Sequence, residues 1–122
     1  RYGKPPAMTK NAPSELEDEL ASAIRESDLP EPVREYKALQ DRKFLWDFAW
    51  AEQRLLVEVQ GGIFRKGAHS TGLGIERDML KLNLATLAGY RSLQFSRRMI
   101  EDGTAIKIIE QALEVNNEKQ QQ

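Results

Sequence analysis

The sequence predicts a single mixed α/β domain in which a central four-stranded sheet is flanked by helices. Two segments carry apolar residues at helical spacing, and three short segments between them have the apolar patterns of strands. Another short apolar segment follows the second helical one, and a last helical segment comes after it. The expected order is therefore αβββαβα, with an antiparallel start to a mixed sheet and helices on both of its faces.

The first predicted helix begins at Ser14, a residue type that caps helix N-termini well. Glu17 follows it at the spacing of a capping box. The apolar face of this helix is formed by Leu16, Leu20, Ala23 and Ile24. The prolines of segment 30–32 end the helix. Residues 1–13 contain three prolines and no apolar periodicity, so they are expected to form a flexible leader.

Three strands are predicted next, at residues 33–39, 43–50 and 55–60. In the second of them, four aromatic residues alternate with other residues, so we expect them to share one face of the strand. These residues are Phe44, Trp46, Phe48 and Trp50. Packing in the core is the preferred interpretation of this aromatic stripe, over stacking on bases. The third segment is almost continuously apolar, which favours a central strand covered on both faces.

A loop rich in glycine and basic residues begins at Gly61 and leads to a helix at residues 75–88. Gly89 closes this helix, because glycine readily adopts the left-handed conformation found after helix C-termini. A fourth strand is expected at residues 90–95, where the chain is again short and apolar. Ser96 is placed to cap the last helical segment.

The last helical segment is expected to break or restart near Gly103 and to end near Val115. Residues 116–122 are polar and are expected to form a disordered tail. The folded domain would then span residues 14–115. A chain of 122 residues without an internal repeat fits one such domain.

Composition excludes several classes of protein. The chain has no cysteine, so it has no disulfide, no thiolate metal site and no cysteine nucleophile. It has neither an apolar run of about 20 residues nor a signal peptide, so no membrane partner and a cytoplasmic location are expected. Net charge is −1, yet residues 61–98 hold seven basic residues against two acidic ones. Such an excess suits phosphate contacts, although a solvated surface explains it equally well.

Carboxylates in apolar strands indicate a candidate site. Glu58 and Gln60 are two residues apart, so they project from the same face at the end of the third strand. Asp47 lies between two aromatic residues in the preceding strand. A buried carboxylate is costly unless it is paired or binds a cation, and oxygen ligands suit Mg²⁺. The open alternative places both carboxylates at an exposed edge, or pairs them with Arg54 or Lys43.

The wider pattern joins these residues to later motifs. Asp47 is followed after ten residues by Glu58-Val59-Gln60-Gly61-Gly62. The later motifs are a His-x-x-Gly-x-Gly loop at 69–74, an Asp-x-x-Lys-x-Asn helix at 78–83 and a strand at 89–95. This combination resembles the PD-(D/E)XK nuclease superfamily, which has the restriction-endonuclease-like fold. Within it, the chain is similar to small phage and bacterial endonucleases related to very-short-patch-repair and Holliday-junction-resolvase-like proteins.

The resemblance, which covers about residues 14–113, implies a metal-dependent endonuclease that hydrolyses DNA phosphodiester bonds. Mg²⁺ would be the cofactor, with Mn²⁺ as a substitute, held by Asp47, Glu58 and the Val59 carbonyl. Gln60 stands where the superfamily usually has a lysine, and it would orient the attacking water. Cleavage of branched or nicked DNA in phage or bacterial recombination or repair is the role that the resemblance favours.

The resemblance also implies roles for residues outside the central motif. Glu17 would be the acidic residue of the first helix, with a plain capping role as the alternative. Lys81 or Arg77 would steady the scissile phosphate. The positive charge of the missing lysine could come from Lys66, His69 or Lys81. DNA contacts are expected from Arg65, Lys66, His69 and Arg77. Arg77 and Lys81 share a helix face, for which a solvated stripe is the alternative.

Two other functions stay open beside the enzyme. A nuclease fold that has lost catalysis and only binds DNA is the second hypothesis, and the glutamine at position 60 favours it. A structural or interaction protein with an accidental likeness is the third. RNA as substrate is not excluded. A homodimer would suit an enzyme that cuts both strands of a duplex, although no segment of the sequence indicates an interface.

Overall fold

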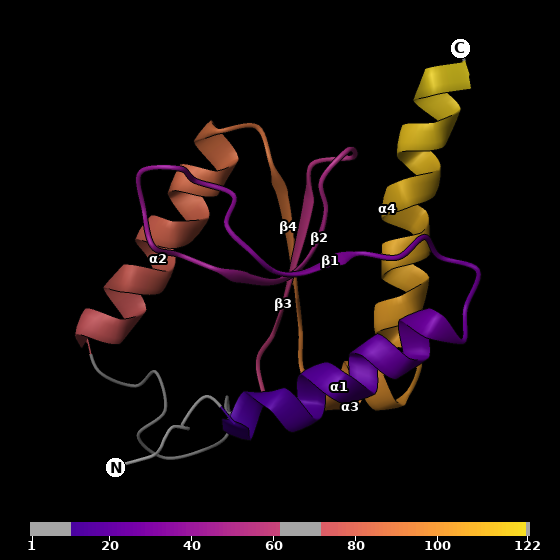
Figure 1. The fold of residues 1–122 in the computed structure, drawn as a ribbon, viewed down its shortest axis with the longest axis horizontal. Coiled ribbons are helices and arrows are strands. Elements are labelled where there is room, and N and C mark those ends of the chain that lie inside the picture. The colour runs from indigo at the N-terminus through magenta and orange to yellow at the C-terminus, as the bar shows by residue number, and fades with distance from the viewer. Residues whose placement is uncertain (1–10, 62–71, 122) are drawn as a thin grey trace.

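The computed structural model describes residues 11–61 and 72–121 of the chain. These ranges contain four helices and four strands in the order αβββαβαα (Figure 1). They are α1 (Asn11–Arg25), β1 (Val33–Tyr36), β2 (Trp46–Trp50), β3 (Leu55–Val59), α2 (Gly72–Leu87), β4 (Arg91–Phe95), α3 (Arg97–Glu101) and α4 (Thr104–Gln121). The predicted order is confirmed, with the last helical segment divided as expected at Gly103.

The four strands form one mixed sheet in the order β1-β2-β3-β4. The first two pairs are antiparallel, and β4 lies parallel to β3. Parallel neighbours need a crossover connection, which α2 supplies between β3 and β4. The predicted mixed sheet with an antiparallel start is therefore confirmed.

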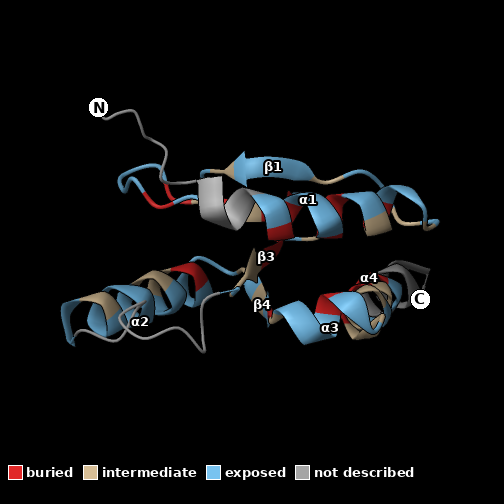
Figure 2. Ribbon diagram, turned by 90° about the horizontal axis from the view of Figure 1, so that it is seen from below, coloured by how far each residue is buried: buried red, intermediate tan, exposed pale blue. Residues whose placement is uncertain are grey.

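Helices cover both faces of this sheet. α2 lies on one face, while α1, α3 and α4 lie on the other (Figure 1). In Figure 2 the buried part of α1 lies on the side of the helix that is turned toward β3. The expectation of helices on both faces is thus confirmed.

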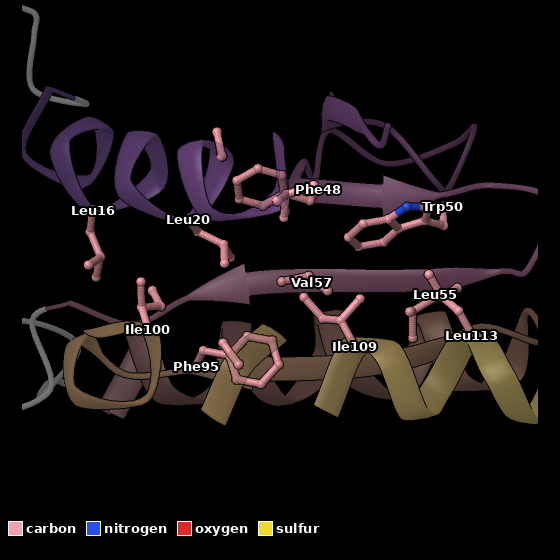
Figure 3. Close-up of a cluster of buried hydrophobic side chains, with 13 residues drawn as sticks. Leu16, Leu20, Phe48, Trp50, Leu55, Val57, Phe95, Ile100, Ile109 and Leu113 are labelled. Carbon is pink, nitrogen blue, oxygen red and sulfur yellow. The ribbon is translucent and has the colours of Figure 1, made fainter. Parts of the chain in front are cut away.

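The larger core lies between the sheet and the three helices of one face (Figure 3). Its buried residues are Leu16, Leu20, Ala21, Ile24, Phe48, Trp50, Leu55, Val57, Phe95, Ile100, Ala105, Ile109 and Leu113. A smaller core lies under α2 and contains Leu39, Phe44, Trp46, Ala49, Leu56 and Ala85. β3 contributes to both cores, which confirms the prediction of a central strand covered on both faces.

The aromatic residues of the second strand segment do not share one face, so that prediction is wrong. Phe48 and Trp50 belong to the larger core, whereas Phe44 and Trp46 belong to the α2 core. The reason is a local break in the strand pairing near Asp47. Arg34 and Tyr36 of β1 pair with Phe48 and Trp46 of β2. Glu35, which lies between them beside Asp47, has a φ of +53°. The alternation of side chains therefore shifts between Trp46 and Phe48. Packing in the core, the preferred interpretation of the stripe, is confirmed.

Several predicted boundaries differ from the structure. α1 begins at Asn11, so Ser14 lies inside the helix and is not its N-cap. The strands are shorter than predicted, and α4 continues to Gln121 where we expected an end near Val115 and a tail. Residues 1–10 of the expected leader lie outside the described ranges. Within those ranges, no helix has the length and apolar character that a membrane span requires.

The helix boundaries predicted at Gly89, Ser96 and Gly103 agree with the structure. Gly89, which follows α2, has a φ of +92°, and Gly103, between α3 and α4, has a φ of +88°. Both angles lie in the region that side chains disfavour, which explains glycine at these positions. Ser96 caps α3, since its Oγ accepts a hydrogen bond of 3.4 Å from the Met99 N–H.

Candidate metal and active site

Three carboxylates from three different elements meet beside the larger core. Glu17 comes from α1, Glu35 from β1 and Asp47 from β2. One oxygen of each lies within 4.8 Å of the others. Glu17 is buried at 7% exposure, Asp47 is half-buried and Glu35 is exposed. We call these three residues the acidic cluster.

Helical spacing brings Glu17 into the cluster. It precedes Ala21 and Ile24 by four and seven residues, so all three lie on the stripe of α1 that faces the sheet. The helix also approaches the end of β3 closely. A Cβ on Gly61 would lie 2.9 Å from Leu16 Cδ2, which is closer than side chains pack. Gly61 therefore lets α1 rest against this end of the sheet, a role that sequence reasoning did not assign to it.

A hydrogen bond from the neighbouring strand holds Asp47. The regular pairing of β2 with β3 reaches Phe48 and Val57. Beyond that pair, Asp47 Oδ2 accepts a hydrogen bond of 2.8 Å from the Val59 N–H. Burial raises the pKa of Asp47, and the bond from Val59 opposes part of that rise. The carboxylate thus sits where the two strands part.

Glu58 lies beside the acidic cluster but faces α2. Its Oε2 accepts a hydrogen bond from Lys81, whose Nζ also donates to the Leu45 carbonyl at 2.8 Å. The Lys81 Nζ lies 4.7 Å from the centroid of the Trp46 ring. Burial raises the pKa of Glu58, while Lys81 opposes the rise and the charge of Asp47 adds to it. Asp47 and Glu58 therefore influence each other electrostatically.

The partner of Glu58 differs from those considered from sequence. Arg54 is engaged elsewhere, because it donates hydrogen bonds to the Ala88 and Gly89 carbonyls. Its guanidinium carbon also lies 4.1 Å from the centroid of the Tyr90 ring. The alternative in which Arg54 pairs with a site carboxylate is therefore wrong. Lys81 of α2 is the ion-pair partner of Glu58 instead.

The other residues singled out from sequence have varied positions. Gln60 is half-buried at the end of β3, and its backbone N–H donates to the Phe95 carbonyl at 2.8 Å. Arg77 is exposed on α2, and its guanidinium carbon lies 5.4 Å from the centroid of the Phe44 ring. Three expected DNA contacts, Arg65, Lys66 and His69, lie outside the described residues.

Glu35 and Arg34 were missed by sequence reasoning. Both lie in a short, mostly exposed strand with no apolar pattern to mark a site. Arg34 Nη2 lies 3.7 Å from Glu17 Oε1 and 3.4 Å from Asp18 Oδ1. The register of β1 on β2 brings Glu35 beside Asp47, and the short β1 segment carries no pattern that predicts this register.

The electrostatics of the acidic cluster suit a cation. Burial, followed by the charges of Asp47 and Glu35, raises the pKa of Glu17 to about 8. Repulsion among three carboxylates is relieved when a positive ion binds between them. All of the donors are carboxylate oxygens, which hard divalent cations such as Mg²⁺ and Mn²⁺ prefer. The residues present therefore fit a site for such an ion.

The raised pKa of Glu17 predicts a specific dependence of stability on pH. Between its ordinary value of 4.5 and about 8, the folded protein keeps a proton that the unfolded chain releases. Stability without metal should therefore be highest below about pH 4.5 with respect to this group and fall as the pH rises toward 8. The expected loss is a few kcal/mol, since one pKa unit corresponds to about 1.4 kcal/mol.

Urea unfolding in EDTA at several pH values between 5 and about 8.5 measures this loss. Glu17→Gln should flatten the dependence and stabilise the metal-free protein at the alkaline end. Glu15→Gln is the matched control, because Glu15 lies on the same helix but is exposed. A slope that is the same in Glu17→Gln and wild type would contradict the prediction.

Comparisons with known proteins bear on the fold. No protein-family model matches the sequence, and a search of curated proteins finds no match. Among solved structures, the catalytic domain of the homing endonuclease I-Bth0305I is similar, with a TM-score of 0.62. The similarity covers 83% of this chain and 94% of that domain, at 19% sequence identity. The chain therefore shares the fold of that domain. The mixed α/β fold predicted from the sequence agrees with this finding.

Proposed function

We propose that the chain is a metal-dependent DNA endonuclease of the PD-(D/E)XK type. The observation that carries this proposal is the acidic cluster, with Glu58 and Lys81 beside it at the same end of the sheet. The fold shared with a homing endonuclease catalytic domain supports DNA as the substrate. The basic excess of residues 61–98 supports phosphate contacts.

Divalent metal binding is part of the proposal. Asp47 would be the central ligand, together with Glu17 and Glu35, and Glu58 would join when Lys81 releases it. The Val59 carbonyl, expected from sequence as a further ligand, is retained as part of the proposal. Bound Mg²⁺ or Mn²⁺ would lower the pKa of the attacking water and would neutralise the negative charge that develops on the phosphate.

The chain's own residues would position the substrate. Lys81 carries a positive charge between Glu58 and the α2 surface, so it can donate to an oxygen of the scissile phosphate. The Gln60 amide can orient the attacking water, because its carbonyl accepts and its NH₂ donates hydrogen bonds. Arg77, four residues before Lys81 on the same helix face, would contact the DNA backbone. Arg65, Lys66 and His69 are proposed as further DNA contacts from the sequence.

A cleavage assay tests the proposal, with Glu35 as the informative new residue. Supercoiled plasmid and a branched DNA are incubated with Mg²⁺, Mn²⁺ or EDTA. We expect cleavage that requires metal, and a loss of about 10- to 100-fold in Glu35→Gln at limiting metal concentration. The preferred DNA would show whether cleavage is structure-specific. The loss in Glu35→Gln should shrink at high metal concentration if the residue acts through metal affinity.

The control is Glu52→Gln, which changes an exposed carboxylate in the turn between β2 and β3. That turn lies at the other end of the β2–β3 hairpin from Asp47, so cleavage should stay at the wild-type level. Equal cleavage by Glu35→Gln and Glu52→Gln at every metal concentration would exclude Glu35 from the site. Cleavage in EDTA would contradict the metal requirement.

A catalytically silent DNA-binding module is the second proposal. Its support is that Glu58 is engaged by Lys81, and that Gln60 replaces the usual lysine. Under this proposal the chain would bind DNA without cutting it in either metal. A gel-shift measurement beside the cleavage assay on the same DNA substrates separates the two proposals, because only the silent module would bind DNA and leave it uncut in both metals.

A further inference from the structure

A cavity lies between the second half of α1 and the segment that leads from this helix into β1. Its volume is about 320 Å³. Ile24 and Phe48, which are both buried, give it an apolar floor. Three charged and exposed residues also line it, namely Arg25, Glu31 and Arg34. An apolar hollow with a few polar groups around it is the usual form of a small-ligand site.

This cavity is next to the acidic cluster. Arg34, which lines the cavity, has its Nη2 3.7 Å from Glu17 Oε1. Ala21 is also in the lining, and it follows Glu17 by about one turn of α1, which is about 6 Å along the helix axis. Phe48 directly follows Asp47 in β2. A ligand in the cavity would therefore be an immediate neighbour of anything that the acidic cluster binds.

Arg34 is held over an aromatic ring. Its guanidinium carbon lies 4.9 Å from the centroid of the Phe48 ring, and its Nη2 lies 3.4 Å from Asp18 Oδ1. The Arg34 side chain is 39% exposed, so part of it is accessible to a ligand. A flat guanidinium is a surface on which a nucleobase can stack, and its charge attracts phosphate. A lysine at this position would offer the charge without the flat surface.

We propose that the cavity binds one unpaired nucleotide of a DNA strand, with the base stacked on the guanidinium of Arg34. Arg25, an exposed residue of the last turn of α1, contacts a neighbouring backbone phosphate. Glu31 can accept a hydrogen bond from the amino group of a base such as cytosine. The volume is at the lower end of the range for ligand pockets, about 300 to 1,000 Å³, which suits one nucleotide better than several.

The cavity thereby selects the structure of the DNA. A base inside a duplex is stacked and paired, so it enters a pocket only after both contacts are broken, whereas an unpaired base enters without that cost. The consequence for cleavage rests on the proposed function. With the base in the cavity, the adjoining phosphodiester lies against the acidic cluster. The preferred substrate would then be a junction between duplex and single-stranded DNA, cut beside the unpaired nucleotide.

Fluorescence anisotropy in EDTA tests the binding separately from any cleavage. Two labelled DNAs are compared, a blunt duplex and the same duplex with a short single-stranded tail of cytosines. We expect wild type to bind the tailed duplex about tenfold more tightly, which is the contribution of stacking one base on a side chain. Arg34→Lys should lower this ratio to near one, because it keeps the charge and removes the flat surface. Contacts with the phosphates of the duplex alone would not change the ratio.

Arg42→Lys is the matched control, because Arg42 is an exposed arginine of the turn between β1 and β2 and does not line the cavity. It should keep the wild-type ratio, and circular dichroism checks that both variants are folded. Equal affinity of wild type for the two DNAs overturns the inference, and metal-dependent cleavage would then still support the proposed endonuclease. A preference that survives in Arg34→Lys also overturns it. Binding of neither DNA, in EDTA or in Mg²⁺, would overturn the inference and the proposed function together.

Titration calorimetry with deoxycytidine monophosphate distinguishes a nucleotide in a DNA strand from a free one. The free nucleotide should bind much more weakly than the tailed duplex, because it lacks the phosphate contacts of the adjoining strand. Binding as tight as that of the tailed duplex would make a free nucleotide the occupant of the cavity and overturn the inference.

Discussion

Asp47→Asn is expected to reduce DNA cleavage by about a thousandfold or more while leaving the fold intact. Asp47 is the proposed central metal ligand, and a catalytic metal supplies several kcal/mol of stabilisation to the transition state. The substitution removes the charge but keeps a side-chain oxygen that can accept the bond from the Val59 N–H. Initial cleavage rates on supercoiled plasmid in saturating Mg²⁺ measure the loss.

A thermal unfolding series supplies the control for this variant. Mg²⁺ or Mn²⁺ should raise the melting temperature of wild type, because a ligand that binds only the folded state stabilises it. The same ions should have little effect on Asp47→Asn. Without metal, the variant should be at least as stable as wild type, because burial raises the pKa of Asp47 and the cluster repels its charge. Full activity, or unchanged stabilisation by metal, would place the metal elsewhere.

Lys81→Met is expected to destabilise the fold by about 2–3 kcal/mol at pH 7, in addition to its effect on cleavage. It leaves Glu58 without its cationic partner, and breaking a buried ion pair costs about 3–5 kcal/mol. The expected cost is smaller than that range because the Lys81 and Glu58 side chains are 15% and 19% exposed, so water reaches the unpaired Glu58. Urea unfolding followed by circular dichroism measures the difference.

Two companion variants distinguish the loss of the ion pair from the loss of packing. The double variant Lys81→Met/Glu58→Gln should recover most of the stability, because no unpaired charge remains. Arg77→Met, which changes a cation stacked on Phe44 on the same helix face, should cost less than about 1 kcal/mol. The loss in Lys81→Met should also shrink as the pH is lowered, because burial raises the pKa of Glu58 and the variant no longer has Lys81 to oppose that rise. A double variant as unstable as Lys81→Met would assign the effect to packing.

The sheet and its covering helices could be predicted because burial imposes periodicity on the sequence. Leu16, Leu20 and Ile24 recur at helical spacing, and β3 is apolar on both faces, so each pattern has one structural solution. The cost of burying a carboxylate likewise predicts from sequence that Asp47 and Glu58 belong to a site. These inferences concern single elements and their local surroundings.

Most features that the sequence did not predict depend on how two elements pack or pair with each other. The sequence of one segment does not encode such contacts. Glu35 joins the acidic cluster only because β1 pairs with β2 in one register. The aromatic residues divide between two cores because the strand pairing breaks near Asp47. Lys81 contacts Glu58 only because α2 packs on the sheet in a position that puts Lys81 over the end of β3. The start of α1 was misplaced because Ser14 is a good cap by residue type, yet the helix extends past it.

The hydrogen bond between Asp47 and Val59 has an evolutionary consequence. One oxygen of Asp47 satisfies a backbone N–H at the point where β2 and β3 part, so this side chain serves the sheet as well as the proposed chemistry. A descendant that abandoned cleavage would still gain from Asp or Asn at this position. Glu17 and Glu35 carry no such structural duty toward the sheet backbone, and repulsion within the acidic cluster would favour their loss. In such a lineage Glu17 and Glu35 would be replaced, while position 47 would keep Asp or Asn. The identity of residues 17 and 35 would therefore distinguish homologues that cleave DNA from those that do not.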